Sequence, residues 1–390
     1  MGLVSKISNI ISAKTPNFHG TYAVFHIFMV ICGLEFFDDD FMVGVFNSVR
    51  FLGPLGSILV AIWTCEIHMR RYIDDVDSTI LSLSALISAG EILLKIMGMA
   101  LKRKKGAQLI AKALNDRSYD DGPMERASFL KYHTMCRKLL CVTIFSYLFT
   151  ALMIVSYPAI AGKLDEYMLP VGYSIPYISH KQQPWYTINY SIIIFHAAYL
   201  ALAFIGLDGP FYIYLCYSTC KLEIIKNYVD QIGEPNNIED QRKLIQKIVG
   251  IHADVLTYLK ECSDFYHDIY LAQVFCSIAH ICLSLFHIQL KFKNSSYGML
   301  ATNVVKMWIF CYCGELVVTK SDEVSKAMYD NRWYTLWHKQ DLKAIQFMLA
   351  NAQTTVGFSI GGFGILSYAT FTVIMKTAYS CNAFLHNMMK

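Results

Sequence analysis

Seven stretches of this chain are long and apolar enough to cross a lipid bilayer, and they constrain the fold more than any other feature. The hydrocarbon core of a bilayer is about 30 Å thick, which a helix spans in roughly 20 apolar residues. Because lipid offers the backbone no hydrogen bonds, each stretch must satisfy its own as a helix. The predicted spans are Phe41–Cys65, Ile73–Ala100, Leu139–Ile160, Thr187–Leu207, Phe265–Leu290, Met299–Val318 and Ile365–Leu385.

The composition agrees with an all-α membrane protein. The chain is 55% hydrophobic and 16% charged, whereas a soluble domain carries about 25% charged residues. No tandem repeat or low-complexity tract divides it, so we expect residues 1–390 to form a single membrane domain. The net charge of +4 is spread over several loops, which argues against a nucleic-acid partner.

A shorter apolar stretch, Thr21–Leu34, precedes the first span. It is apolar for only about 14 residues, too few to cross the bilayer, and it runs into Glu35 and Asp38–Asp40. We therefore expect a re-entrant or interfacial helix within residues 1–40. If it were a full span, the N-terminus would change sides while all later loops kept theirs.

Lys and Arg are distributed unevenly among the loops. The N-terminal segment and the loops after the second, fourth and sixth spans hold about three times as many as the alternate set. Short cytoplasmic loops accumulate these residues, so the pattern predicts a cytoplasmic N-terminus and an extracellular C-terminus. This is the reverse of a G-protein-coupled receptor. Two glycosylation sequons, at Asn189 and Asn294, fall on or beside loops that the bias places outside.

The sequence holds no recognisable catalytic constellation. Histidine pairs at zinc-ligand spacing are missing, and His280 and His287 are seven apart, which is typical of helix packing. Cys311 and Cys313 have no second cluster that would complete a metal site, and Gly361–Gly364 does not follow a strand as a phosphate-binding loop would. We expect neither an enzyme nor a cofactor or metal site.

Ionisable residues inside the spans are few, and each is costly there unless it is paired or wetted. Glu91 and Lys95 are four residues apart on the second span, the spacing of a helical ion pair. Arg50, in the first span, needs a polar partner, or its side chain must extend to the membrane–water interface. Lys306 and Lys376 either face water or have structural partners. A transporter relay would need several such groups with acidic partners, and we expect this chain to lack them.

Glycines at 361, 362 and 364 interrupt the last apolar region and predict a break between two helices. Upstream, Leu342–Ala352 is an amphipathic helix. Downstream, hydroxyl-bearing residues alternate with apolar ones in Ile365–Leu385. These hydroxyls either face water or bond within the membrane helices. Helices are also expected to continue beyond the membrane through the charged loops Lys102–Lys131 and Asp208–Asp264.

Two C-terminal segments resemble the insect odorant receptor family. Residues 311–334 contain Cys-Tyr-x-Gly-Glu, a charged helix, Ala-x-Tyr and Trp-Tyr, as in the connection between the sixth and seventh spans of that family. Residues 361–380 carry Phe-x-x-Ile-x-Lys-Thr-Ala-Tyr-Ser, as in its last span. Order and spacing both match over about 80 residues, whereas the rest of the chain matches in hydropathy and topology.

The resemblance implies a plasma-membrane, ligand-gated, non-selective cation channel built as a heterotetramer with the family's shared co-receptor subunit. A small volatile organic molecule would be the ligand. The co-receptor has a long insertion after its fourth span, and this chain lacks one, so the chain resembles a tuning subunit. The alternatives are a gustatory-type channel of the same superfamily, and, less favoured, a G-protein-coupled receptor or a transporter.

The resemblance also implies where the functional residues lie. Spans one to six would occupy residues 41–320, with a cytoplasmic anchor at 321–358 and a pore-lining last span at 359–390. The pore or gate candidates are Lys376, Tyr379, Asn382 and His386. Family ligands bind between the second, third, fourth and sixth spans, with some contribution from the fifth. Depth and helical spacing put these residues there: Leu83, Leu86, Ile87, Thr150, Met153, Tyr157, Ser191, Phe195, Tyr199, Leu300, Asn303 and Val304.

Overall fold

The computed structural model describes residues 18–37, 44–160, 162, 167–176, 178–179, 181–234, 238–291, 294–336, 338–354 and 356–388. Over these residues the chain is almost entirely helical, which confirms the all-α fold class. The elements in chain order are α2 (His19–Ile31), α3 (Gly44–Arg71), α4 (Val76–Leu101), α5 (Arg103–Asn115), η1 (Ser118–Asp120), α6 (Pro123–Ile160), α7 (Trp185–Val229), α8 (Ile238–Leu290), α9 (Ser296–Asp330), η2 (Trp333–Thr335), α10 (Lys339–Ala352) and α11 (Tyr368–Met388).

Six of the described helices, α3, α4 and α6 to α9, are long and apolar enough to span a membrane. They correspond to the first six predicted spans. Helices α6 to α9 contain their spans and extend beyond them, whereas α4 begins three residues later than predicted and residues 41–43 of the first predicted span lie outside the described residues. Helix α7 has 45 residues, a length of about 68 Å at 1.5 Å per residue, and so reaches well beyond a bilayer core. The seventh predicted span is α11, whose 21 residues mix polar with apolar side chains.

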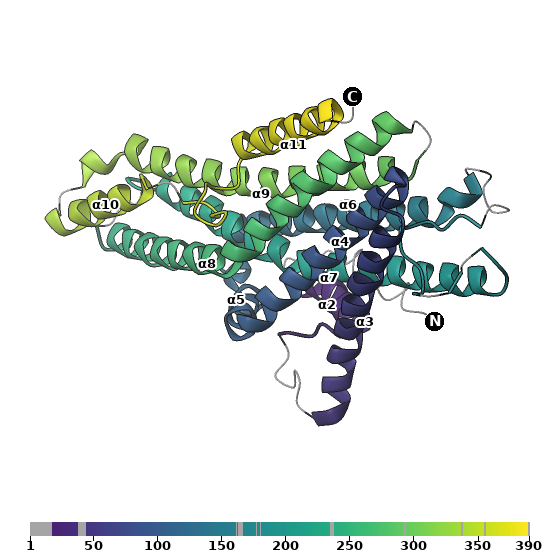
Figure 1. The fold of residues 1–390 in the computed structure, drawn as a ribbon. Coiled ribbons are helices and arrows are strands. Elements are labelled where there is room, and N and C mark those ends of the chain that lie inside the picture. The colour runs from purple at the N-terminus through teal and green to yellow at the C-terminus, as the bar shows by residue number, and fades with distance from the viewer. Residues whose placement is uncertain are drawn as a thin grey trace.

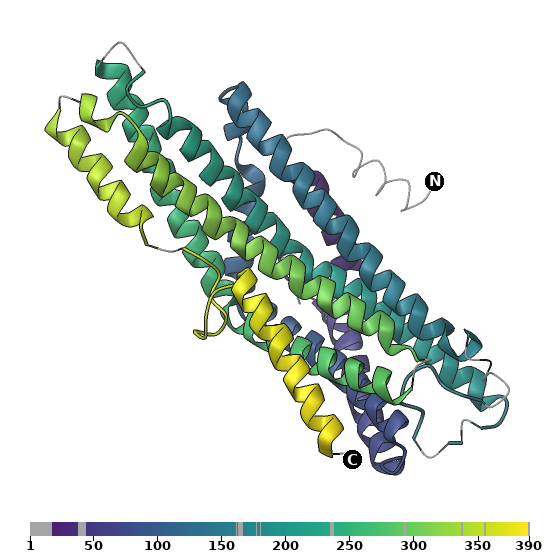
Figure 2. The ribbon, with the colours of Figure 1, turned by 90° about the horizontal axis from the view of Figure 1, so that it is seen from above.

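Helix α7 is the centre of the bundle. Every residue from 203 to 222 is buried, the pattern of a helix with neighbours on all sides. Helices α6, α9, α2 and α8 all pack against it, and Figure 1 and Figure 2 show it running through the middle of the molecule. Asp208 lies inside this helix and is buried. The fourth span was predicted to end at Leu207 with helix continuing through Asp208–Asp264, and α7 does continue as a helix to Val229.

The short helix α2 packs into the bundle rather than projecting from it. Its buried face includes Phe25 and Phe28, and Phe25 lies directly over Gly209 of α7. At its end, the carbonyl of Val30 accepts a hydrogen bond from the Arg50 guanidinium, which also forms a 2.8 Å ion pair with Glu35. Arg50 thus has polar partners inside the protein, and they join α2 to α3.

A second polar junction attaches the segment after α5 to the far end of α7. The Lys221 ammonium is 2.5 Å from the Asp116 carboxylate, and the Tyr217 hydroxyl donates to the same carboxylate at 2.7 Å. Burial opposes the ionisation of Asp116, but the charge of Lys221 and the hydrogen bonds from Lys221, Ser118 and Tyr217 together outweigh it, so the pKa of Asp116 lies below its ordinary value.

The glycine-rich segment separates α10 from α11, as predicted. Gly361 and Gly362 have φ angles of +55° and +80°, a region that glycine adopts without strain. The segment is held by hydrogen bonds from the Ser359 amide to the Ser263 hydroxyl and from the Gly361 amide to the His267 carbonyl. Helix α11 then runs along α8 and α9, as Figure 2 shows in yellow.

The connections alternate between the two ends of the bundle. In Figure 2 the α6–α7 and α8–α9 connections and the C-terminal end of α11 lie toward one end, whereas α10 and the α7–α8 turn lie toward the other. The asparagines of both glycosylation sequons form hydrogen bonds within the protein. Asn189 accepts from the Ile175 amide at 2.7 Å, and Asn294 donates to the His287 carbonyl at 2.9 Å. Because both side chains are buried, neither presents its amide for glycosylation in this conformation.

The close approach of α2 to α7 predicts opposite effects for two glycine-to-alanine substitutions. A Cβ at Gly209 would lie 1.9 Å from the Phe25 ring, so Gly209→Ala should destabilise the protein by roughly 1–3 kcal/mol. A Cβ at Gly250, on α8, meets nothing within 4 Å, so Gly250→Ala should stabilise it by about 0.5–1 kcal/mol. Thermal unfolding in detergent measures both. Equal effects would contradict the described packing of α2.

Candidate ligand-binding site

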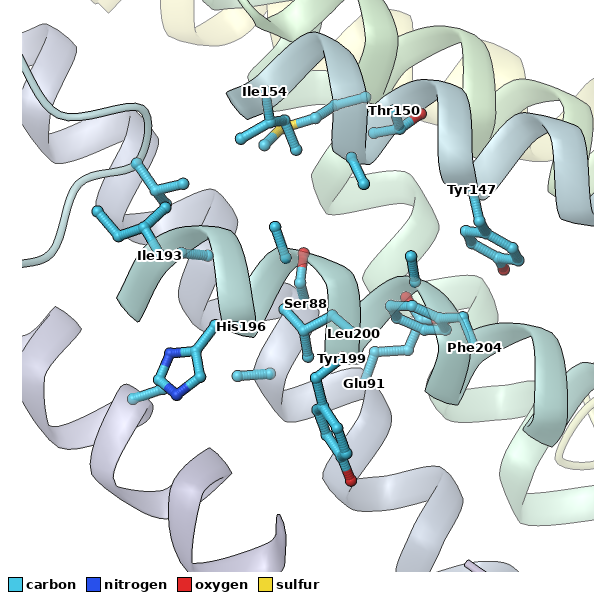
Figure 3. Close-up of a pocket in the computed structure, with 18 of the residues that line it drawn as sticks. Ser88, Glu91, Tyr147, Thr150, Ile154, Ile193, His196, Tyr199, Leu200 and Phe204 are labelled. Carbon is cyan, nitrogen blue, oxygen red and sulfur yellow. The ribbon is translucent and has the colours of Figure 1, made fainter. Parts of the chain in front are cut away.

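A cavity of about 130 Å³ lies inside the bundle. It is close in size to cavities of about 150 Å³ that bind benzene. Its wall comes from α3, α4, α6, α7, α8 and α9, together with the connection between α6 and α7. Figure 3 shows side chains of α4, α6 and α7 converging on this space. The prediction from the resemblance did not include α3 or that connection.

Most of the wall is apolar. Aliphatic and aromatic side chains from α3, α4, α6, α7 and α9 and from the α6–α7 connection form it, so shape and dispersion forces would dominate the binding of a ligand. The ring of Phe204 stacks on that of Tyr147 with centroids 5.2 Å apart, which fixes one side. The larger apolar residues of the wall include Ile58, Ile154, Ile193, Tyr199, Leu200 and Phe204.

A few polar groups interrupt this surface. The Thr150 hydroxyl contacts that of Thr302 and lies 3.1 Å from the carbonyl of Gly298. The Ser88 hydroxyl lies 3.2 Å from Nε2 of His280. A small number of oriented polar groups in an apolar cavity is typical of small-molecule sites.

The connection between α6 and α7 folds over the cavity. Val171 and Tyr173 belong to the wall, and the Tyr173 hydroxyl lies 3.0 Å from Nδ1 of His196. The carbonyl of Gly172 accepts a hydrogen bond from the Ser82 hydroxyl at 2.5 Å. A Cβ at Gly172 would lie 2.5 Å from the backbone nitrogen of Ser82, so only glycine permits this close approach to α4.

An ion network forms one end of the cavity. The Lys306 ammonium of α9 donates to both carboxylate oxygens of Glu91 at 2.8 and 3.0 Å. Glu91 is also 3.1 Å from Lys95, whose ammonium donates to Asp208 at 2.7 Å. The Tyr147 hydroxyl donates to the other oxygen of Asp208 at 2.7 Å. Helices α9, α4, α7 and α6 are thus joined in one chain of polar contacts.

This network changes the predictions about charges inside the spans. Glu91 and Lys95 do pair, but each also has a partner on another helix. Lys306 has a structural partner and also lies on the cavity wall. The expectation that the chain lacks several such groups with acidic partners is wrong, because two lysines and two carboxylates pair here across α4, α7 and α9.

Three of the predicted pocket residues line the cavity: Thr150, Tyr199 and Asn303. Phe195 is 66% exposed on the outside of the bundle, whereas the next residue, His196, lines the cavity. The two residues are neighbours in sequence and lie on different sides of α7. Hydropathy does not determine how a helix is rotated about its own axis within lipid. Nine predicted residues lie outside the described wall: Leu83, Leu86, Ile87, Met153, Tyr157, Ser191, Phe195, Leu300 and Val304.

Several cavity residues were not predicted. Ser88, Glu91 and Lys306 had a usable signal, since polar side chains within apolar spans turn away from lipid. The small residues on α3 and α7, such as Ala61 and Ala197, carry no such signal.

The predicted gate residues occupy two sides of α11. Lys376 and Tyr379 are exposed on this chain, together with Thr372, Thr377 and Ser380. Asn382 is 2% exposed and lies on the side that packs into the bundle, and His386 is half-buried.

Comparison with known proteins identifies the family. Residues 75–379, most of the chain, match the family model described as 7tm Odorant receptor. The chain belongs to this odorant receptor family. The family is one of receptors rather than enzymes, and the apolar helices make this receptor a multi-pass membrane protein.

The relatives are distant. Odorant receptor 13a of Drosophila melanogaster is 20% identical over 239 residues, covering 55% of this chain and 57% of the relative. Odorant receptor 24a of the same fly is 26% identical over 209 residues, covering 50% of this chain and 51% of the relative. The receptor thus spans about half the length of the curated relatives that it matches.

A solved structure shares the fold over nearly the whole chain. The insect olfactory receptor OR5 from Machilis hrabei, in complex with eugenol, matches with a TM-score of 0.79 and 13% identity. The match covers 94% of this chain and 97% of OR5. A second structure of OR5 matches with a TM-score of 0.76 and 12% identity, covering 93% of this chain and 96% of OR5.

The ion network predicts that charge balance matters more than the presence of any one charge. Lys95→Met leaves Asp208 buried without its cation and should destabilise the receptor by about 3–5 kcal/mol. The double variant Lys95→Met/Asp208→Asn removes one charge of each sign and should recover most of that loss. Thermal unfolding of purified receptor tests both. A double variant less stable than Lys95→Met would show that the charges do not compensate one another.

Proposed function

We propose that this receptor binds a small volatile organic molecule in the cavity between α3, α4, α6, α7, α8 and α9. The observation that carries the proposal is an apolar space of about 130 Å³ within the helix bundle, with a few oriented polar groups. Thr150, Tyr199 and Asn303 are proposed ligand contacts from the original prediction, and Ser88, His196 and Phe204 are added from the cavity wall. OR5, which shares the fold, is in complex with eugenol, a small organic molecule of the proposed kind.

The receptor is further proposed to act as a subunit of a ligand-gated cation channel, in a heterotetramer with the family's co-receptor. Two surfaces support assembly. Helix α11 leaves Thr372, Lys376 and Ser380 exposed on the single chain, as a helix facing an aqueous pore would. Large exposed aromatic side chains mark the anchor region, and such surfaces are typical of interfaces: Tyr329, Trp333, Tyr334 and Phe347.

Its proposed role is that of the tuning subunit, because the α7–α8 turn is short, with α7 ending at Val229 and α8 beginning at Ile238. The proposed topology places the N-terminus in the cytoplasm and the C-terminus outside, following the charge bias of the loops. Ligand would bind the open arrangement of helices better than the closed one and so shift the population toward it.

A matched pair of substitutions tests the cavity. Ala151 lines it, whereas Ala159, two turns further along α6, is exposed. Ala151→Phe should fill the space and raise the ligand concentration for half-maximal current at least tenfold, a loss of about 1.4 kcal/mol. Ala159→Phe should leave it unchanged. The measurement is whole-cell current across an odorant panel, in cells expressing the receptor with the co-receptor.

The same recordings test the channel. Current should require both subunits and persist when intracellular nucleotides are washed out. Dependence of the current on those nucleotides would contradict a directly gated channel, and equal effects of the two phenylalanine variants would contradict the cavity as the site.

A further inference from the structure

One end of the cavity differs from the rest in its chemistry. Glu91, Lys306 and His280 all border the space there, and all are buried, at 1%, 6% and 3% exposure. The remaining wall is mostly hydrocarbon. A ligand that fills the cavity therefore meets an apolar surface over most of its length and charged or polar atoms at one end.

The Lys306 ammonium at this end has hydrogen-bonding capacity that the described residues do not use. A lysine ammonium has three N–H donors, and both hydrogen bonds that Lys306 makes to described residues go to one carboxylate, that of Glu91. The His280 ring contacts Ser88 through Nε2, while its buried Nδ1 has no partner among the described residues. Buried polar atoms are normally satisfied, so the remaining N–H of Lys306 can bind an oxygen atom of a ligand.

The charge balance restricts what kind of ligand fits. Glu91 and Asp208 carry two negative charges, and Lys95 and Lys306 carry two positive ones, so the network is neutral. A charged ligand would add an uncompensated charge within membrane helices, which is costly. An uncharged hydrogen-bond acceptor adds none.

We infer that this receptor selects small uncharged molecules that carry a single oxygen-containing group, such as an alcohol or a phenol, and that the Lys306 ammonium donates a hydrogen bond to that oxygen. The hydrocarbon part lies against Phe204 and the α6–α7 wall. Glu91 positions the Lys306 ammonium toward the cavity. This inference rests on the proposed function and specifies the ligand class for the same cavity.

The size of the cavity sets the probes. Six-membered rings are appropriate for about 130 Å³, so phenol is compared with toluene, and cyclohexanol with methylcyclohexane. Each pair has nearly the same shape and differs in one oxygen. A hydrogen bond to a charged group is worth roughly tenfold or more in affinity. Cyclohexylamine, protonated at neutral pH, serves as the charged probe.

The experiment measures ligand-induced thermal stabilisation of the purified receptor and current from the full complex with the co-receptor. In the wild type, phenol and cyclohexanol should act at concentrations at least tenfold below those of their hydrocarbon partners, and cyclohexylamine should be inactive. In Lys306→Met/Glu91→Gln, which keeps the Lys95–Asp208 pair and the charge balance, the ratio should fall to within about twofold. Hydrocarbon potency should be retained.

Lys326→Met is the matched control. It is the same substitution on the same helix, at a residue paired with Asp322 on the exposed surface, and it should leave the oxygen preference unchanged. A preference that persists in the double variant would overturn the assignment of Lys306. Equal potency of oxygenated and hydrocarbon probes in the wild type, or no binding of phenol and cyclohexanol, would also overturn it, even if the double variant failed to fold.

The two proposals fail differently. In one outcome the hydrocarbon probes act through the cavity, as judged by loss of the responses to toluene and methylcyclohexane in Ala151→Phe, while the oxygen atom adds nothing to potency. In that case the cavity remains the ligand site, and its polar end does not select oxygen-containing ligands. If Ala151→Phe changes no response, the cavity itself is not the site.

Discussion

Two lysines and two carboxylates buried among α4, α7 and α9 are stable within membrane helices only because they neutralise one another. The distances of 2.7 to 3.1 Å between them leave little freedom in how these helices rotate or slide. Tyr147 extends the chain of contacts to α6. Because a rotation that separates any pair leaves a charge unpaired, the network fixes which faces of four helices look inward, and hence which residues surround the cavity.

The rest of the bundle supports this arrangement from outside. Helix α2 packs on α7 at Gly209, directly beside Asp208, and the α6–α7 connection closes on α4 through Gly172. Both contacts depend on glycine, since a Cβ would separate the backbones. Close backbone approaches thus hold the elements around the cavity, and charged groups bound it at one end, which is how an apolar space can also have a defined polar end.

The sequence predicted well where the helices lie along the chain, but it predicted poorly which side chains face one another between helices. Apolar length located six spans, the glycines at 361 and 362 located the break before α11, and the sequence motifs in residues 311–380 indicated the family that the comparison established. The residues of the pocket were harder to predict: of the twelve predicted, Thr150, Tyr199 and Asn303 line the cavity. Hydropathy distinguishes lipid from water, but inside a bilayer the lipid face and the packed face are both apolar, so it leaves helix rotation undetermined.

By itself, the sequence determined the membrane environment, the helical fold and the alternation of loops, because these follow from local apolar length and from charge counts. Only the tertiary structure decided that Asp208 sits inside a helix opposite Lys95, that Lys306 meets Glu91 across 215 positions, and that Phe195 faces outward while His196 faces the cavity. Each of these depends on how two helices are rotated against each other, and that rotation is set by the sum of contacts among all of them.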